Sequence, residues 1–152
     1  HFVQRAGNKI RYIDKVLPTA NIFATGSYIG LELEMSSTAV GKAILAELPE
    51  EEVRKIWNQG ENVIFTPHTI QSLDQLLKEL EEARDTGFAY AWEDREAGLC
   101  CVGVSVRDYR GIYNYGISIS APVTRTKEDN LTRIQEKLWE TKQIVSELIS
   151  GN

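Results

Sequence analysis

Cysteine and histidine are scarce in this sequence. The two cysteines, Cys100 and Cys101, are adjacent, so the chain has neither a disulfide framework nor a CxxC redox or zinc motif. Only His1 and His68 are present, which leaves no histidine cluster for a metal or a catalytic triad. We therefore expect no cofactor and no bound metal, and the cysteine usage agrees with a reducing compartment.

Long apolar runs and an excess of positive charge are also missing. No stretch approaches the roughly 18 apolar residues of a membrane span, and the first residues lack the charged-then-apolar order of a signal peptide. The net charge of -5 opposes a nucleic-acid surface, because phosphates are neutralised by clustered Lys and Arg. We expect a cytoplasmic chain that contacts no membrane and does not bind DNA by itself.

Nothing in the sequence divides the chain into two domains. Its 152 residues contain no repeat, no low-complexity tract and no Gly/Ser/Pro linker, and 42% of them are hydrophobic. That length and composition suit one globular domain with a core large enough to fold alone. We expect a single domain over residues 1–152.

Three helices are predicted before residue 90. Ser36 or Ser37 offers an N-cap to STAVGKAILAEL (37–48), in which apolar residues recur at helical spacing. Pro49 opens a short acidic helix, EEEVRKIW (50–57). The segment SLDQLLKELEEARDTG (72–87) begins with Ser72 as its cap, carries a leucine stripe and ends at Gly87.

A fourth and longer helix is predicted at the end of the chain, from about Thr126 to Ile149. Apolar residues recur along it every three or four positions and form one stripe, which we expect to cover a sheet face. The stripe consists of Leu131, Ile134, Leu138, Val145 and Leu148.

Four strands are predicted. NKIRYIDKV (8–16), with Ile10, Tyr12 and Val16 as strand formers, and NIFAT (21–25) are expected to form an antiparallel pair. GLCCVGVSVRD (98–108) and GIYNYGISIS (111–120) are expected to form a hairpin through a turn from Asp108 to Gly111. Together with the helices, these strands predict an α/β fold of the α+β type.

One face of the predicted hairpin is unusual. Side chains alternate along a strand, so the valines gather on one face, while Leu99 shares the other face with the small residues Cys101, Gly103 and Ser105. The expected pairs on that face are Cys101 with Ser118, Gly103 with Gly116, Ser105 with Asn114, and Leu99 with Ser120. Such a face is typical of strands that something approaches closely, such as a ligand. A solvent-exposed face explains it equally well.

The start of the first predicted helix is a candidate anion site. In MSSTAVGKA, the free backbone N–H groups of Thr38, Ala39 and Val40 have no bulky side chain beside them. The Gly-Lys pair that follows is not a phosphate loop, because the motif's first glycine and its final Ser or Thr are both missing. The alternative interpretation is that a serine only caps a core helix.

Three segments in combination resemble the IclR family of transcriptional regulators. They are SSTAVGKAILAELPEEE, GLCCVGVSVRDYRG, and YGISISAP with the long final helix behind it. They match, in order and spacing, the typical family segments HATALGKALLA-LPEEE and GVRCVAAPVFD-GEVVAALSVSGP. The resemblance extends from about Asn8 to the end of the chain, and its specificity comes from the combination.

The resemblance implies a GAF-like or profilin-like antiparallel sheet flanked by helices, with a pocket between the sheet and the first predicted helix. It implies that the N–H groups of Ala39 and Val40 bind an effector carboxylate, while hydroxyl and thiol groups of the hairpin contact its polar end and leucines line the walls. The candidate effector-binding residues are Thr38, Ala39, Val40, Cys101, Ser118, Ser120, Leu33, Leu99, Glu93 and Asp94.

Two departures from the family pattern bear on which effector is accepted. The family uses an acidic residue in the loop before the cysteine-bearing strand, whereas WEDREAG keeps Glu93, Asp94 and Glu96 close to that place but shifted. Ser36 stands where many relatives have histidine. We therefore expect the specificity to differ.

The resemblance implies a ligand-sensing domain that is not an enzyme. It would bind a small anionic metabolite, such as a sugar acid, a keto acid or an aromatic acid, and form a homodimer or homotetramer. DNA would be bound only through an N-terminal winged helix-turn-helix, which we do not expect this acidic chain to supply. Two alternatives stay open: a cysteine-dependent enzyme that uses Cys101 with Glu93 or Asp94, and a protein-interaction module that docks through its small-residue face.

Overall fold

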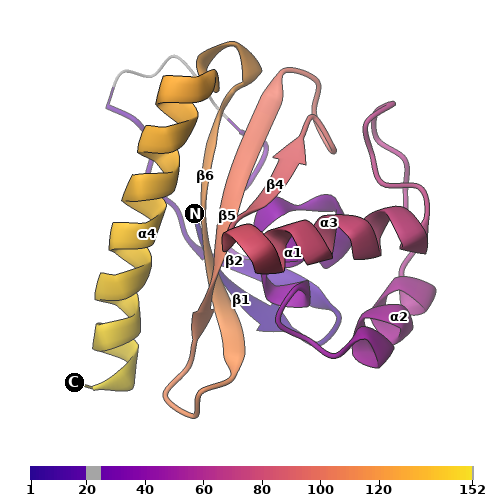
Figure 1. Cartoon of the computed structure of the whole chain (residues 1–152), viewed down its shortest axis with the longest axis horizontal. Helices are drawn as coiled ribbons and strands as arrows, with labels where there is room; N and C mark the ends of the chain where they lie inside the picture. Colours follow the sequence, from indigo (N-terminus) through magenta and orange to yellow (C-terminus); the bar gives the residue numbers. More distant parts are fainter. Residues whose placement is uncertain (20–24, 152) are drawn as a thin grey trace.

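A computed structural model describes residues 1–19 and 25–151. One antiparallel sheet of six strands lies between helices on both of its faces (Figure 1). The strands, in the spatial order β3-β2-β1-β6-β5-β4, are β1 Phe2–Ala6, β2 Lys9–Asp14, β3 Glu32–Glu34, β4 Ala89–Trp92, β5 Leu99–Arg107 and β6 Tyr113–Pro122. The predicted α+β class, with an antiparallel sheet and flanking helices, is confirmed.

The helices are divided between the two faces of the sheet (Figure 1). Three lie on one face: α1 Ala39–Leu45, α2 Glu50–Gln59 and α3 Leu73–Thr86. The long helix α4 Glu128–Ser150 covers the other face alone, after a short 3₁₀ turn at Val123–Arg125. Within the described residues, no helix has the length and apolar character needed to cross a bilayer.

Local capping explains where α3 begins and ends. The Ser72 hydroxyl accepts a hydrogen bond from the N–H of Gln75, and Gly87 ends α3 with a φ of 84° in the left-handed region. Pro49 precedes α2 as predicted. The expected cap of α1 was wrong: Ser36 and Ser37 belong to a 3₁₀ turn at Met35–Ser37, and the cap is Thr38.

The two faces of the sheet bury separate cores. The face under α1, α2 and α3 buries aliphatic residues of β1, β2 and the three helices, among them Val3, Ile10, Ile44, Val53 and Leu80. The opposite face buries Val102, Val104, Val106 and Ile117 against Leu138 of α4. Leu148 was wrongly placed on the buried stripe: it is 76% exposed, because the stripe continues through Ile149, four residues after Val145.

The N-terminal strands differ from the prediction. Val16 is 86% exposed and follows the end of β2, so it is not a core strand residue. The second expected strand, 21–25, lies outside the described residues except for Thr25. The partners of β2 are instead β1, which the sequence did not reveal, and the short β3.

The β5–β6 hairpin forms, but its register is shifted by two residues from the prediction. Cys101 pairs with Ser120, Gly103 with Ser118, Ser105 with Gly116 and Leu99 with Pro122. The N–H of Asp108 donates to Ile112 O at 2.7 Å, and Gly111 has a φ of 80°, so the turn carries one bulge residue. A second irregularity lies between Val106 and Arg107. A shift of two residues keeps each side chain on its predicted face.

Candidate functional site

Helix α1 packs directly on the small-residue face of the hairpin. A Cβ atom on Gly103 would lie 2.7 Å from Ala39 C and Val40 N, and a Cβ on Gly116 would lie 2.3 Å from Val40 Cγ2. The helix backbone therefore occupies the space beside Gly103, and the Val40 side chain occupies the space beside Gly116. Neither a ligand nor solvent does, so both explanations of these two glycines were wrong.

A cavity opens where α1 begins, next to the rest of that face. Its volume is about 130 Å³, and its walls come from β2, β5, β6, the start of α1 and the segments around β3 and residues 94–96. Every predicted effector-binding residue except Glu93 lines it: Leu33, Thr38, Ala39, Val40, Asp94, Leu99, Cys101, Ser118 and Ser120. Lining residues that were not predicted include Tyr12, Leu31, Ser37, Arg95 and Glu96.

The backbone at the start of α1 offers donors to the cavity. Thr38 Oγ1 accepts the N–H of Gly41 at 3.1 Å, and the N–H of Thr38 donates to Met35 O at 3.4 Å. Among the described residues, the N–H groups of Ala39 and Val40 have no hydrogen-bond acceptor. These are the donors that the first turn of a helix cannot satisfy internally.

The hairpin contributes hydroxyl and thiol groups. Cys101 Sγ lies 3.0 Å from Ser120 Oγ, its cross-strand neighbour, and Ser118 is 5% exposed. Burial raises the pKa of the Cys101 thiol above its ordinary value, against the effect of the hydrogen bond with Ser120. Burial also raises the pKa of Cys100 to about 12. Both groups are neutral thiols at neutral pH, which is unfavourable for a nucleophile.

Asp94 lines the cavity, but its carboxylate is bound by the ammonium group of Lys42 in α1. Lys42 Nζ donates to Asp94 Oδ2 at 2.6 Å, to Glu79 Oε2 at 2.6 Å and to Tyr90 O at 2.9 Å. Lys42 is 1% exposed and Asp94 5%. Burial raises the pKa of Asp94, and the Lys42 ammonium acts in the opposite direction. The sequence did not reveal Lys42 as a buried ion-pair residue, although a lysine between the apolar residues of α1 was the available signal.

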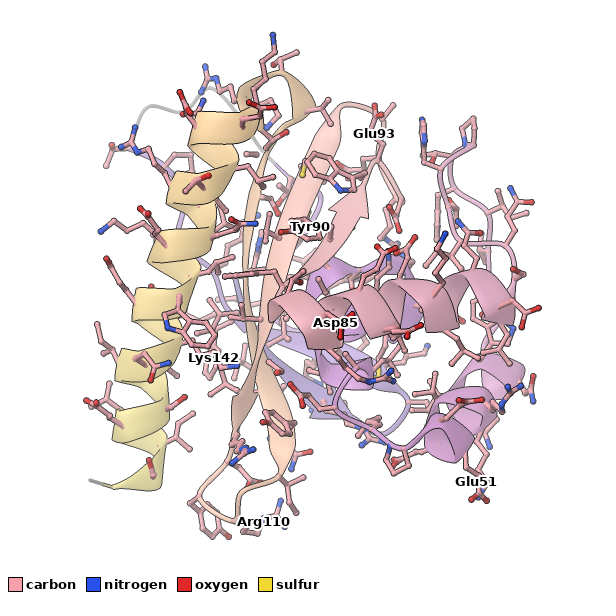
Figure 2. All side chains as sticks on the ribbon, viewed as in Figure 1. Glu51, Asp85, Tyr90, Glu93, Arg110 and Lys142 are labelled. Atoms are coloured by element: carbon pink, nitrogen blue, oxygen red, sulfur yellow. The ribbon has the colours of Figure 1, made fainter. Side chains whose placement is uncertain are left out.

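Glu93 does not take the position expected for it. It lies in the turn after β4 (Figure 2), with a φ of 59°, and its Oε1 accepts the N–H of Gly98 at 2.8 Å. It therefore closes the turn between β4 and β5, and it is not among the residues that line the cavity. Glu96 is the acidic residue of this loop that, with Asp94, borders the cavity.

Comparison with known proteins agrees with this geometry. The family described as "Bacterial transcriptional regulator IclR C-terminal" matches residues 1–147. Among curated proteins, the HTH-type transcriptional regulator KdgR of Dickeya chrysanthemi is 40% identical over 123 residues, which are 81% of this chain and 40% of that protein. The chain therefore spans less than half of that relative's length.

Solved structures show the same fold. The Thermotoga maritima IclR has a TM-score of 0.91 and 33% identity, over 99% of this chain and 60% of that one. A mutant inducer-binding domain of the Acinetobacter transcription factor PobR, solved with 3-hydroxybenzoic acid, has a TM-score of 0.85 over 97% of this chain and 87% of that one. Its 20% identity shows the fold alone.

The family match covers nearly the whole chain, and the relatives are transcriptional regulators and not enzymes. The described cavity lies where the motifs SSTAVGKA and YGISIS meet. This chain belongs to the IclR family of bacterial transcriptional regulators, and it matches their C-terminal domain.

Proposed function

We propose that this domain senses a small anionic metabolite, such as a sugar acid, a keto acid or an aromatic acid, in the cavity at the start of α1. The observation that carries the proposal is the cavity itself. It combines the free N–H groups of Ala39 and Val40, the hydroxyls of Ser118 and Ser120, and apolar walls. A few convergent polar groups in an apolar pocket are typical of a small-molecule site.

The size of the cavity favours a small ligand. Its volume is about 130 Å³. The apolar walls, which include Leu31, Leu33 and Leu99, suit a short carbon skeleton. Backbone N–H donors at a helix start favour a negatively charged group at one end of that skeleton.

The sensing role depends on the rest of the regulator. We propose that residues 1–152 form one domain of a cytoplasmic homodimer or homotetramer whose DNA contacts are made by an N-terminal winged helix-turn-helix. A ligand shifts such an assembly only if it binds one conformation better than the other. That preference would change the spacing of two DNA-binding modules, and therefore the affinity for DNA.

A thermal-shift screen tests the proposal. The probes are pyruvate, lactate, gluconate and benzoate, each paired with its neutral amide. A ligand that binds only the native state stabilises it by about 2.7 kcal/mol at one hundred times its Kd. For a chain of this size that predicts a rise in Tm of roughly 5–10 °C with at least one acid.

Matched variants locate the binding site. Ser118→Ala and Ser120→Ala remove cavity hydroxyls and should reduce the shift, whereas Ser146→Ala, on α4 across the sheet, should leave it unchanged. If only the neutral amides stabilise the wild type, the ligand is not an anion. Equal shifts in the wild type and in both cavity variants would place the site elsewhere.

A further inference from the structure

Arg95 places a half-buried guanidinium in the wall of the cavity. Its Nη1 donates to Ser37 Oγ at 3.0 Å, and its Cζ lies 4.1 Å from the centre of the Phe65 ring. The hydrogen bond and the stacked ring hold the group from two sides. Arg95 is therefore fixed in position and not a freely moving surface side chain.

This guanidinium has unused donors. An arginine carries five N–H donors, and the structure describes a partner for Nη1 only. Among the described residues, Arg95 forms no ion pair with a carboxylate. The neighbouring Asp94 carboxylate is held by Lys42, so it does not neutralise Arg95. A partly desolvated, unpaired cation in a cavity wall favours a ligand that supplies the missing negative charge.

The groups around Arg95 leave its guanidinium charged. Burial lowers the pKa of Arg95, while Tyr12, Glu96 and Glu34 act in the opposite direction, and an arginine stays charged at neutral pH. Glu96 lines the cavity without pairing with Arg95. Within the described part of the chain, Arg95 is the only lysine or arginine among the lining residues.

We propose that Arg95 binds the carboxylate of the effector, and that the effector is a carboxylic acid with at least one further hydrogen-bonding oxygen. Ser37, the partner of Arg95, lies two residues before Ala39, so the guanidinium and the free N–H groups of the helix start border the same part of the cavity. The second oxygen meets the hydroxyls of Ser118 and Ser120 from β6. This inference rests on the proposed function.

Calorimetric titration of the full chain tests the role of Arg95. The probes are lactate, pyruvate and gluconate with their amides, and the proteins are wild type, Arg95→Gln, Arg95→Lys and Arg133→Gln. Arg133 is an exposed residue of α4, so its variant reproduces the change in net charge away from the cavity. The melting temperature of each unliganded variant shows whether it is folded.

The wild type should prefer the acid to its amide. Arg95→Gln should bind the acid about ten- to hundredfold more weakly, as expected when a charged hydrogen-bond partner is lost, and bind the amide as before. The affinity of Arg95→Lys for the acid should lie between those of the wild type and Arg95→Gln, because lysine keeps the charge without the planar fork of arginine. Arg95→Lys also tests the proposal if Arg95→Gln does not fold. Arg133→Gln should match the wild type.

Two results separate failure of this inference from failure of the proposed function. If Arg95→Gln binds the acid as tightly as the wild type while Ser118→Ala and Ser120→Ala weaken it, the cavity is the effector site and Arg95 is not its anion-binding group. If the wild type binds none of the acids or amides, the proposed function itself is wrong.

Discussion

Single residues of β5 and β6 determine how closely α1 approaches the sheet. Gly103 and Gly116 lie under the first turn of α1, and no side chain larger than hydrogen fits between the helix and either strand. Beyond the helix start, Cys101, Ser118 and Ser120 face the cavity. One face of the hairpin therefore has two functions, divided at the point where the helix begins.

Replacing Gly103 with alanine tests this division. Its Cβ would lie 2.7 Å from backbone atoms of Ala39 and Val40, so α1 has to move away from the sheet. We expect Gly103→Ala to lower the free energy of unfolding by about 1–3 kcal/mol, the usual cost of overpacking, and to weaken acid binding in the adjacent cavity. Urea titration and calorimetry measure the two effects.

The matched control is Gly60→Ala. There the three atoms nearest to the added Cβ, at 3.0 Å or more, belong to the Glu34 and Asn62 side chains and not to the backbone, so the loss of stability should be smaller than in Gly103→Ala. A Gly103→Ala protein as stable as the wild type would show that α1 does not press on the strand.

Which residues share a face was predictable from the sequence, because side chains alternate along a strand by local geometry alone. Other site residues were not predictable, because their partners lie far along the chain. Lys42 reaches Glu79 and Asp94, which are 37 and 52 residues away, and Arg95 reaches Ser37, which is 58 residues away. No local pattern records such contacts.

Whole elements show the same difference between local and distant determinants. The helices α2, α3 and α4 were predictable from signals within each segment: Pro49 before α2, the Ser72 cap and leucine stripe of α3, and the apolar stripe of α4. The strands β1 and β4 were missed, since with five and four residues each is too short to show a clear alternation of apolar and polar side chains. The hairpin register was missed because bulges, which the turn sequence does not reveal, moved it by two residues.

Asp108 organises the tip of the β5–β6 hairpin, where Arg110 lies at the end far from Glu93 (Figure 2). Its Oδ1 accepts the N–H groups of Arg110 at 2.8 Å and Ile112 at 3.1 Å, and its Oδ2 accepts Asn114 Nδ2 at 2.9 Å. Burial acts to raise the pKa of Asp108, but these bonds and the Arg110 guanidinium together hold it well below 3.8.

These contacts predict a pH dependence of the hairpin's stability. An aspartate with a lowered pKa in the folded state stabilises it above the unfolded-state pKa of 3.8, and the contribution is lost as the pH falls below that value. We expect Asp108→Asn to be less stable than the wild type at neutral pH, and the difference to shrink in acid. Urea unfolding at a series of pH values measures it.

Asp85→Asn provides the comparison, because Asp85 is exposed on α3 (Figure 2) and far from the turn. It should differ little from the wild type at any pH. A stability gap between wild type and Asp108→Asn that stays constant in acid would contradict the assigned role of the Asp108 carboxylate.

At the scale of the whole molecule, the net charge is unfavourable for binding DNA. The net charge of -5 repels a phosphate backbone, whereas non-specific DNA binding depends on many Lys and Arg contacts and reaches a Kd of roughly 10⁻⁴–10⁻⁶ M. We expect this chain alone to leave the mobility of a DNA duplex unchanged at physiological salt, with or without an acid. Retardation in a gel-shift assay would contradict this expectation.

The separation of the two cores by a single sheet has a mechanical consequence. Along β6, Ser118 faces the cavity while its neighbours Ile117 and Ile119 pack on the side of α4. These side chains share one backbone. If β6 bends to fit a ligand in the cavity, the side chains that pack against α4 therefore move as well. The strand β6 is then both a wall of the cavity and part of the surface on which α4 packs. A structural change in the cavity therefore has to pass through only one strand to reach α4.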